Sequence, residues 1–490
     1  MAAARRSLRL VLSLLVALPL LALGGGAATA RSALPSLRLI TASDRVEVSR
    51  YGHGRVYIDF GAYVADATAP LEIHVWRTDY HSDPQAALVL RGHDGPTIRA
   101  LPDAVVDRYL RGIRGFFRLK LVSKAGKLVT DRVLPFCPNG WDVQRVDPSG
   151  PLVPTYPYSC TGNPFAVGMV WGLNRGWAAP AVSTYETRFF LDDGRYFAFL
   201  SIRNRYRRLF HIPRRDAKVE ITVDVSTSGD CGYYCGGVAP RVSSETTDRT
   251  ILTPAPRLHL VDRRTMPDLI ALPAFSISTR RNNKRDLLSF GANVWNRGPS
   301  PLVVEGYREP GEELMHAYQY FLRGDEVVGR KRVGKLEFDD RDGHEHWHFR
   351  QFASYRLLDD SKRLVVRSKK EAFCLAPTDQ VDMLAPNAVW RPYSIGLETA
   401  CGGPTALWIR ETLPVGWGDT YYQWLPGQSF DITDVPNGTY FIKVRANPAG
   451  VLYDRYAGND VRLRKVILKG TPGHRKVAVP PWHGIDTDGR

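Results

Sequence analysis

Three alternating histidines constrain the fold of this 490-residue chain more than any other feature of its sequence. The segment His344-Glu345-His346-Trp347-His348 has a histidine at every second position. Successive side chains of a β-strand point to opposite faces, so an extended segment would direct all three imidazoles to one face. Three neutral imidazoles on one face can bind copper or zinc. The segment therefore predicts a strand with a metal site; the alternative interpretation is a histidine-rich surface strand.

The rest of the chain also favours strands, and we expect an all-β fold with few helices. Short alternating or apolar runs rich in β-branched and aromatic residues occur at 56–60, 71–76, 116–122, 185–201, 219–225, 286–295, 315–322, 353–358, 364–366, 429–432, 439–446 and 461–468. Gly324-Asp325 is typical of a hairpin turn.

A proline-containing segment marks an expected boundary between two parts of the chain. Thr253-Pro254-Ala255-Pro256 reads as a linker, so residues 31–255 would form one or two β-sandwich-like domains of open role. Residues 256–470 would form a second β-rich domain, whose elements begin at Asp268-Leu269-Ile270. The Pro/Gly-rich residues 471–490 predict a loose, flexible tail.

The first thirty residues have the pattern of a secretory signal peptide. Arg5 and Arg6 precede an apolar run from Leu8 to Leu23, and Ala28-Thr29-Ala30 resembles a cleavage site. The alternative is a membrane anchor, but the run is short and small residues follow it. We therefore expect cleavage near Ala30 and a secreted protein with no integral membrane span after cleavage.

Export permits disulfide bonds among the six cysteines. Sequence cannot decide among 15 connectivities, and nearest-neighbour pairing is the simplest hypothesis. It joins Cys137 with Cys160, Cys231 with Cys235, and Cys374 with Cys401. Cys231 and Cys235 could instead bind a metal, although no second pair or nearby histidine supports that alternative.

A net charge of +16 predicts attraction to polyanions such as acidic cell-wall polymers, membrane surfaces and nucleic acid. Anionic cell-wall polymers are the candidate partner, and we expect no specific nucleic-acid binding, because no nucleic-acid motif accompanies the charge. On a strand, Arg203, Arg205 and Arg207 would form one basic face; a solvated surface is the default interpretation.

Further motifs follow the histidines in a fixed order. Lys370-Glu371-Ala372-Phe373-Cys374-Leu375 comes first, then Asp419-Thr420-Tyr421, then Gln423-Trp424 with Asp431-Ile432-Thr433-Asp434. With the H-x-H-x-H segment, these four motifs make residues 260–468 resemble the catalytic domain of the lysyl oxidase family, the secreted copper amine oxidases.

The resemblance implies a copper site at His344, His346 and His348, and an organic cofactor made by the protein itself. Lys370 and Tyr421 match the lysine and tyrosine that become lysine tyrosylquinone. A desolvated lysine is nucleophilic, and a redox metal is needed to oxidise a phenol. Lys369 and Tyr422 are the competing neighbours, and the motif alignment favours Lys370 and Tyr421.

The implied reaction converts peptidyl lysine or another primary amine to an aldehyde, with ammonia and hydrogen peroxide as products. A base must remove the substrate's α-proton. Asp431 and Asp434 lie near Tyr421 in sequence, but a turn or strand-end cap is the favoured interpretation for both. The acidic Asp339-Asp340-Arg341-Asp342 segment could attract a cationic amine.

The resemblance also implies a calcium site. The matching positions are Asp268, the backbone of Leu269, Asp454, Asn459 and Asp460, and oxygen ligands suit calcium. Tyr456 departs from the family pattern, and the alternative is a surface turn.

Two other functions stay open. A zinc enzyme could use the same histidines, and a non-catalytic secreted protein could bind a metal there.

Overall fold

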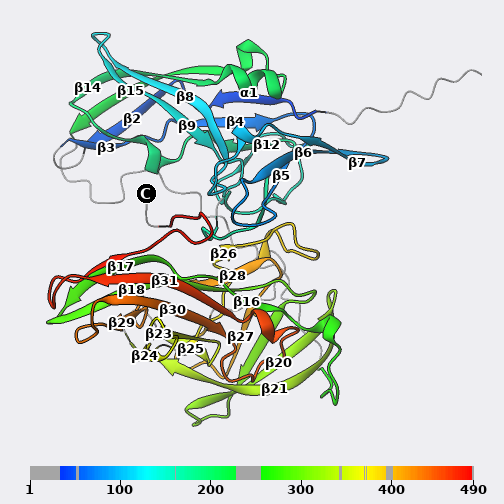
Figure 1. Cartoon of the computed structure of the whole chain (residues 1–490). Helices are drawn as coiled ribbons and strands as arrows, with labels where there is room; N and C mark the ends of the chain where they lie inside the picture. Colours follow the sequence, from blue (N-terminus) through cyan, green and yellow to red (C-terminus); the bar gives the residue numbers. More distant parts are fainter. Residues whose placement is uncertain are drawn as a thin grey trace, which may run out of the picture.

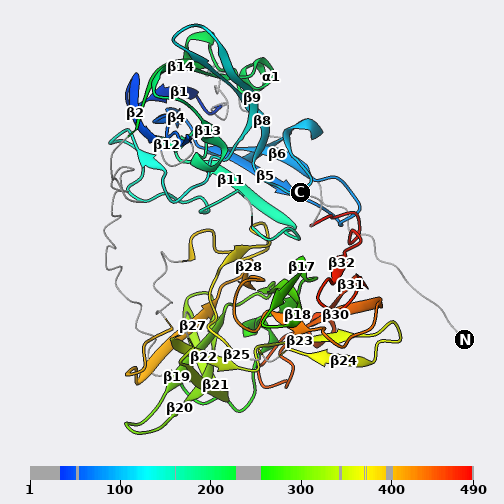
Figure 2. The same ribbon diagram turned by 90° about the vertical axis from the view of Figure 1, so that its left-hand side faces the viewer.

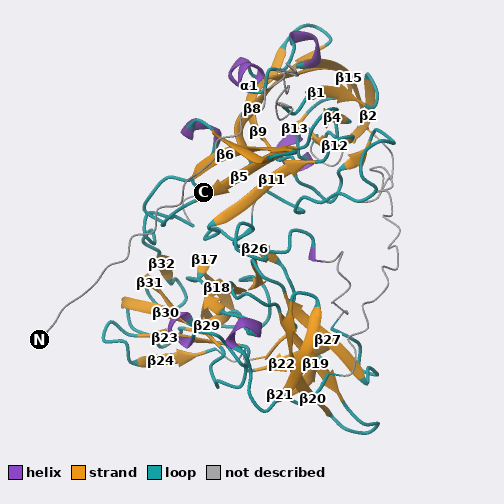
Figure 3. Cartoon of the chain, turned by 90° about the vertical axis from the view of Figure 1, so that its right-hand side faces the viewer, coloured by secondary structure: helices purple, strands orange, loops and turns teal. Residues whose placement is uncertain are grey.

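The computed structural model describes residues 34–50, 54–160, 162–227, 255–341, 345–368, 370, 372–392 and 401–487. These residues form an N-terminal unit, up to residue 227, and a C-terminal unit, from residue 255 on, which are drawn one above the other in Figure 1. Strands dominate both units (Figure 3), so the expected all-β class is confirmed. The predicted signal peptide and residues 253 and 254 of the predicted linker lie outside the described residues.

Helices are few and short in the described residues. They comprise α1 (Asn204–Leu209) and the 3-10 turns η1 (Asp103–Val105), η2 (Thr184–Thr187), η3 (Arg214–Asp216), η4 (Arg263–Thr265) and η6 (Ala457–Asn459). None of the helices described is long and apolar enough to cross a membrane.

Four sheets form the N-terminal unit around one apolar core. In spatial order they are β1 (Leu37–Thr41), β4 (Ala62–Asp66), β12 (Trp177–Pro180), β10 (Gln144–Arg145); β11 (Gly168–Leu173), β5 (Leu71–Trp76), β6 (Gln85–Gly92), β7 (Gly95–Ala100); β13 (Arg188–Phe190), β3 (Arg55–Tyr57); and β2 (Arg45–Arg50), β15 (Lys218–Thr227), β14 (Gly194–Ile202), β8 (Ile113–Ser123), β9 (Leu128–Phe136). Strand β8 buries Phe116, Phe117, Leu119 and Leu121 completely, as expected of a β-rich sandwich-like core.

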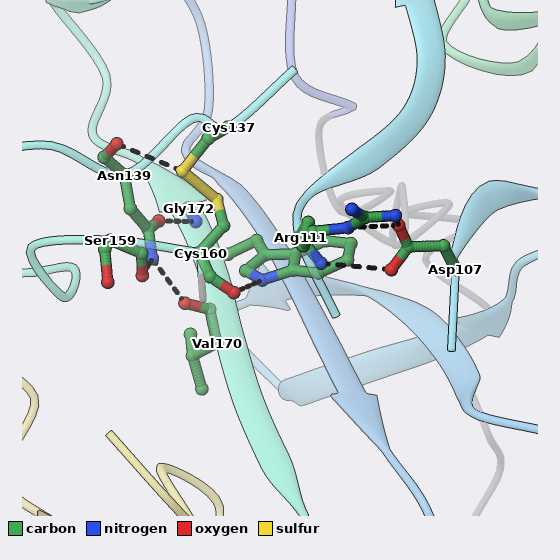
Figure 4. The surroundings of a disulfide bond; sticks show 9 residues. Asp107, Arg111, Cys137, Asn139, Ser159, Cys160, Val170 and Gly172 are labelled. Atoms are coloured by element: carbon green, nitrogen blue, oxygen red, sulfur yellow. Dashed lines mark hydrogen bonds and ion pairs between the residues drawn. A yellow bond between two sulfur atoms is a disulfide. The ribbon is translucent and has the colours of Figure 1, made fainter. Parts of the chain in front are cut away.

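The predicted Cys137–Cys160 disulfide is present and lies within a hydrogen-bonded network (Figure 4). The Asn139 side-chain amide donates to the Val170 carbonyl at 2.8 Å and accepts from the Gly172 amide at 2.7 Å. The Trp171 indole donates to the Cys160 carbonyl at 2.9 Å. The covalent bond and these contacts fix the loop beside β11. Cys231 and Cys235 lie outside the described residues.

The basic segment after β14 is not a strand, so the condition for one basic strand face is not met. Arg203 precedes α1, which contains Arg205 and Arg207. The Arg203 and Arg205 guanidinium groups donate to the carbonyls of Gly115 and Arg114, at the start of β8. These arginines therefore hold neighbouring backbone instead of forming a continuous charged face.

Three sheets form the C-terminal unit. They are β16 (Leu269–Ala271), β18 (Arg285–Asn296), β28 (Trp417–Tyr421), β26 (Asp379–Gln380), with β17 (Phe275–Asn282) and β29 (Ser429–Asp431) also paired to β18; β25 (Ala372–Phe373), β22 (His346–Arg350), β21 (Glu326–Asp339), β20 (Leu314–Arg323), β19 (Leu302–Tyr307), β27 (Trp408–Leu413); and β24 (Leu364–Arg367), β23 (Ala353–Leu358), β30 (Gly438–Ala446), β31 (Val461–Lys469), β32 (Lys476–Ala478).

Some strands match the sequence expectations and others do not. Strands β5 and β23 have the predicted bounds, and Gly324-Asp325 connects β20 to β21 as the predicted hairpin turn. The predicted run 185–201 is divided among η2, β13 and β14, and β3 covers only the start of the run 56–60. Gly324 has φ +60°, a conformation that a glycine adopts without steric cost. The apolar faces of the strands enclose one large core, which includes Trp347, Phe349, Phe373 and Tyr421.

The C-terminal segment is not loose throughout, contrary to the prediction for residues 471–490. Strand β32 extends the third sheet, and the chain then runs to the space between the two units (Figures 1 and 2). There Trp482 packs on Tyr80, the Tyr109 hydroxyl donates to the Asp486 carbonyl, and Ile485 is fully buried. The tail thus connects the units, because its isolated apolar side chains are buried between them.

Candidate active site

Two of the three predicted metal-binding histidines lie side by side on β22. The ring centroids of His346 and His348 are 4.7 Å apart, while Trp347 between them points to the opposite face. Trp347 is fully buried, packs on Phe338 and donates its indole N–H to the Gly403 carbonyl. The alternation predicted for this segment therefore holds for these residues. His344 lies outside the described residues.

Asp339, which pairs with His346 in the register of β21 and β22, contacts the imidazole of His348. Its Oδ2 lies 3.3 Å from Nδ1 of His348, and Arg341 binds the same carboxylate. An imidazole held at Nδ1 by a carboxylate binds metal ions through Nε2. Asp339 is therefore occupied within the site, and Arg341 neutralises part of the acidic segment that was expected to attract substrate.

The environment of His346 keeps its imidazole neutral. Burial, followed by the nearby Lys370 ammonium, lowers the pKa of His346 below its usual range. A neutral imidazole is the form that binds metal ions.

Lys370 lies over the ring of Tyr421. Its Nζ is 4.4 Å from the ring centroid of Tyr421 and 5.2 Å from that of Phe373. The side chain is only 3% exposed, and Nζ has no hydrogen-bond partner among the described residues. Burial, followed by the neighbouring charge of Arg341, lowers the pKa of Lys370 to about 8. Such an amine is neutral far more often than a surface lysine.

The Tyr421 ring is fixed at the end of β28. Its hydroxyl accepts from the Cys374 amide at 2.9 Å and donates to the Cys374 carbonyl at 3.1 Å. The Phe373 ring meets it edge-on at 4.8 Å. Because Cys374 is only four residues after Lys370, these contacts bring the two motifs together.

The competing neighbours do not share this position. Tyr422 stacks on Trp424 at 4.6 Å, and its hydroxyl donates to Asp379 at 3.4 Å. Tyr422 follows the last residue of β28, and its contacts with Trp424 and Asp379 place it apart from Lys370. Lys369 lies outside the described residues.

The predicted Cys374–Cys401 disulfide is present. The Cys401 carbonyl accepts from the Trp347 amide at 2.9 Å, so this disulfide connects the lysine segment to the histidine strand.

Two buried acids beside Tyr421 were missed by the sequence reasoning. Asp419 is 3% exposed and Glu411 is 1% exposed. Burial raises the pKa of both carboxyls well above the usual range. Glu411 accepts from the Leu375 amide at 3.1 Å, whereas Oδ2 of Asp419 has no hydrogen-bond partner among the described residues. The sequence signal was the alternation of Asp419 with Tyr421, which gives them one face of β28.

Asp431 and Asp434 lie outside this cluster. Asp431 accepts from the backbone amide and the hydroxyl of Thr433 and is exposed. This is the turn-capping role that the alternative interpretation predicted.

The predicted calcium ligands come together between β16 and the loop before β31. The Leu269 amide donates to Asp454 at 3.0 Å, and the Asn459 amide group donates to Asp268 at 3.1 Å. Burial and its hydrogen bond with Asp454 raise the pKa of Asp460 to about 8. One oxygen of each of Asp454, Asn459 and Asp460 is buried without a partner among the described residues.

Neither predicted metal site is complete in the part of the chain that the structure describes. No group of three or more histidine, cysteine, aspartate or glutamate side chains there is arranged to hold a metal ion. For the histidine site, the third predicted ligand is His344, which is not among the described residues.

Comparisons with known proteins agree with the motifs. The family model "Lysyl oxidase" matches residues 329–472. Protein-lysine 6-oxidase of Gallus gallus is 34% identical over 122 residues, which are 24% of this chain and 25% of that protein. The protein-lysine 6-oxidase of Sus scrofa is 34% identical over 24% of this chain and 43% of its own length.

Lysyl oxidase homolog 4 of Mus musculus is 31% identical over 137 residues, 28% of this chain and 16% of that protein. The chain thus spans a quarter of the length of the chicken relative and less of the mouse protein. The matched region contains His346, His348, Lys370 and Tyr421. Residues 329–472 are a lysyl oxidase family domain.

Proposed function

We propose that the C-terminal unit is a secreted copper-dependent amine oxidase, which oxidises peptidyl lysine or other primary amines to aldehydes with release of ammonia and hydrogen peroxide. The observation that carries this proposal is the position of Lys370 Nζ, 4.4 Å from the centre of the Tyr421 ring. A buried amine that no described residue accepts from has a large energetic cost, which a role in cofactor formation explains.

The donor set fits copper. His346 and His348, with His344, would supply three imidazole nitrogens, a set that suits copper and zinc alike. Copper differs from zinc in exchanging single electrons with oxygen and a phenol, which is the chemistry that Tyr421 requires. Asp339 holds His348 in the tautomer that leaves Nε2 for the metal.

Lys370 and Tyr421 are the proposed precursors of lysine tyrosylquinone. The low pKa of Lys370 would favour the neutral amine, which would form the C–N bond to an oxidised Tyr421 ring carbon; the ring proton would be lost, and oxygen would take the two electrons needed to restore the quinone. The hydrogen bonds from Cys374 hold the ring, and the Cys374–Cys401 disulfide fixes the segment that carries Lys370. The mature quinone would supply an electrophilic carbonyl to the substrate amine.

Asp419 is the proposed catalytic base. It shares a face of β28 with Tyr421, and Lys370 is the main charge acting on it. Oδ2 is the oxygen that would accept the α-proton of the substrate, since no described residue hydrogen-bonds to it. A buried carboxylate with a raised pKa is a suitable general base near neutral pH.

A structural calcium ion is proposed at Asp268, the Leu269 backbone, Asp454, Asn459 and Asp460. Burial, and then the neighbouring Asp454 carboxyl, raise the pKa of Asp460, and a divalent cation would favour the ionised form of both groups. A cation here would tie the first strand of the unit, β16, to the loop before β31.

The amine-oxidase proposal is tested by reconstituting the purified chain with copper or with zinc. A panel of primary amines and a lysine peptide are then assayed for peroxide and aldehyde. We expect turnover with copper only, inhibited by phenylhydrazine. Equal turnover with zinc would support a zinc enzyme, and inactivity of a metal-loaded folded protein toward the whole panel would support a non-catalytic metal-binding protein.

A further inference from the structure

A cavity lies between the two units, away from the candidate active site. Its volume is about 520 Å³, within the 300–1,000 Å³ typical of small-ligand sites. Trp76, Arg77 and Tyr80 line it from the N-terminal unit, and Trp295, Arg462 and Trp482 line it from the C-terminal unit and its tail.

Arg77 brings unsatisfied positive charge to the wall of this cavity. The residue is only 6% exposed, and its Nη2 donates to the Arg108 carbonyl at 2.7 Å. Its Nε and Nη1 have no acceptor among the described residues, and the same is true of the Trp295 indole N–H, which is 4% exposed. Buried donors of this kind are costly unless a bound acceptor satisfies them.

The charges around the cavity favour an anion. Arg77, Arg297 and Arg462 line it with a single acid, Asp382. Asp382 accepts a hydrogen bond from the Leu384 amide and lies close enough to Arg297 for that charge to act on it. Arginine is well suited to a carboxylate, which it can bind with two parallel hydrogen bonds.

The remaining walls are aromatic. Trp482 packs against Tyr80 with ring centroids 4.9 Å apart, and the Arg77 guanidinium lies 5.5 Å from the Tyr80 centroid. Aromatic walls with a few fixed polar groups suit a ring-shaped ligand that has both an apolar face and polar edges. Asp382 adds an acceptor for a hydroxyl group of the ligand. A simple aromatic acid has no such hydroxyl group, so Asp382 favours a ligand that carries one.

We propose that this cavity binds an acidic sugar, with the carboxylate held by Arg77 and Arg297, the ring against Trp76 and Trp482, and a hydroxyl group donating to Asp382. The register of β18 with β28 pairs Trp295 with Gly418 and Val294 with Asp419. Trp295 therefore projects from the face of this sheet opposite to Asp419 and Tyr421. A sugar held there leaves the candidate active site open.

The test uses the full mature chain and isothermal titration calorimetry. The probes are glucuronate, the neutral sugar glucose, benzoate, and polygalacturonate. We expect saturable glucuronate binding with a Kd on the order of 1 mM or tighter, and weaker binding of glucose and benzoate. Binding of both glucuronate and polygalacturonate assigns a residue of an acidic polymer, whereas binding of glucuronate with exclusion of the polymer assigns a free sugar acid.

Three variants complete the design. Arg77→Gln should weaken glucuronate binding by at least about tenfold, because a charge-assisted pair is lost. Arg297→Gln, at an exposed position, should weaken it by a few-fold even if Arg77→Gln does not fold. Arg188→Gln, an exposed arginine on β13 that does not line the cavity, should leave the Kd unchanged.

The proposal is overturned by any of three results. The first is no saturable glucuronate binding up to about ten times the expected Kd. The second is binding of glucose or benzoate as tight as that of glucuronate. The third is glucuronate or polymer binding that Arg297→Gln and Arg188→Gln weaken equally, since that would reflect only the overall positive charge.

Discussion

Replacing Lys370 with methionine should stabilise the copper-free protein while preventing cofactor formation. Lys370 is 3% exposed, and no described residue accepts a hydrogen bond from its Nζ. Methionine has a similar length and no charge, so the variant removes the buried ammonium and keeps most of the packing. A functional residue held at the expense of stability is common in active sites.

The magnitude follows from the pKa of Lys370, which is about 8 in the folded chain against the usual 10.5. Between these values the unfolded chain binds a proton that the folded chain does not, so wild-type stability rises with pH over this window. Below about pH 8 the full penalty applies, about 3 kcal/mol at 1.36 kcal/mol for each pH unit. At pH 10 less than about 1 kcal/mol of it remains.

The assay is urea denaturation of the copper-free wild type and variant at pH 7 and pH 10. Lys370→Met should be more stable by about 3 kcal/mol at pH 7, and the difference should nearly vanish at pH 10. Lys469→Met, at an exposed position on β31, is the matched control and should change stability little. If Lys370→Met is less stable than the wild type at pH 7, or if the difference in stability does not change with pH, Lys370 is not a buried lysine with a lowered pKa.

Three further predictions concern the same unit. Asp419→Asn should slow amine oxidation by about 10²–10⁴-fold, with a larger deuterium isotope effect on the α-carbon, while Lys370 still becomes cross-linked; an unchanged rate would exclude Asp419 as the base. Tyr421→Phe should abolish phenylhydrazine labelling and Tyr422→Phe should preserve it, so the reverse pattern would reassign the tyrosine. Asp460→Asn should remove any calcium-dependent rise in Tm without lowering Tm in the absence of calcium, as measured by calorimetry; a calcium response that persists would place the ion elsewhere.

The alternation of histidines predicted the local geometry of β22 correctly. Period two alone puts His346 and His348 on one face and Trp347 on the other, whatever the rest of the fold. Tyr422 lies beyond the end of β28, and its contacts with Trp424 and Asp379 separate it from Tyr421. The pairing of Lys370 with Tyr421 came from the family motifs, because no local pattern shows that residues 51 positions apart will touch.

Other features depend on tertiary contacts that a local pattern does not contain. The arginines from 203 to 208 fit either a strand or a short helix. With helix α1 formed, Arg203 and Arg205 donate hydrogen bonds to backbone carbonyls of β8. The tail is rich in proline and glycine, yet Ile485 is buried between the units. Asp419 looks like any strand residue until its burial beside Tyr421 is seen.

Peptide mapping by mass spectrometry after copper loading tests the central claim most directly. We predict one cross-linked species that contains both Lys370 and Tyr421, formed in air with copper and absent from the copper-free protein. Recovery of Lys370 and Tyr421 as separate, unmodified peptides from copper-loaded protein that oxidises amines would contradict the account.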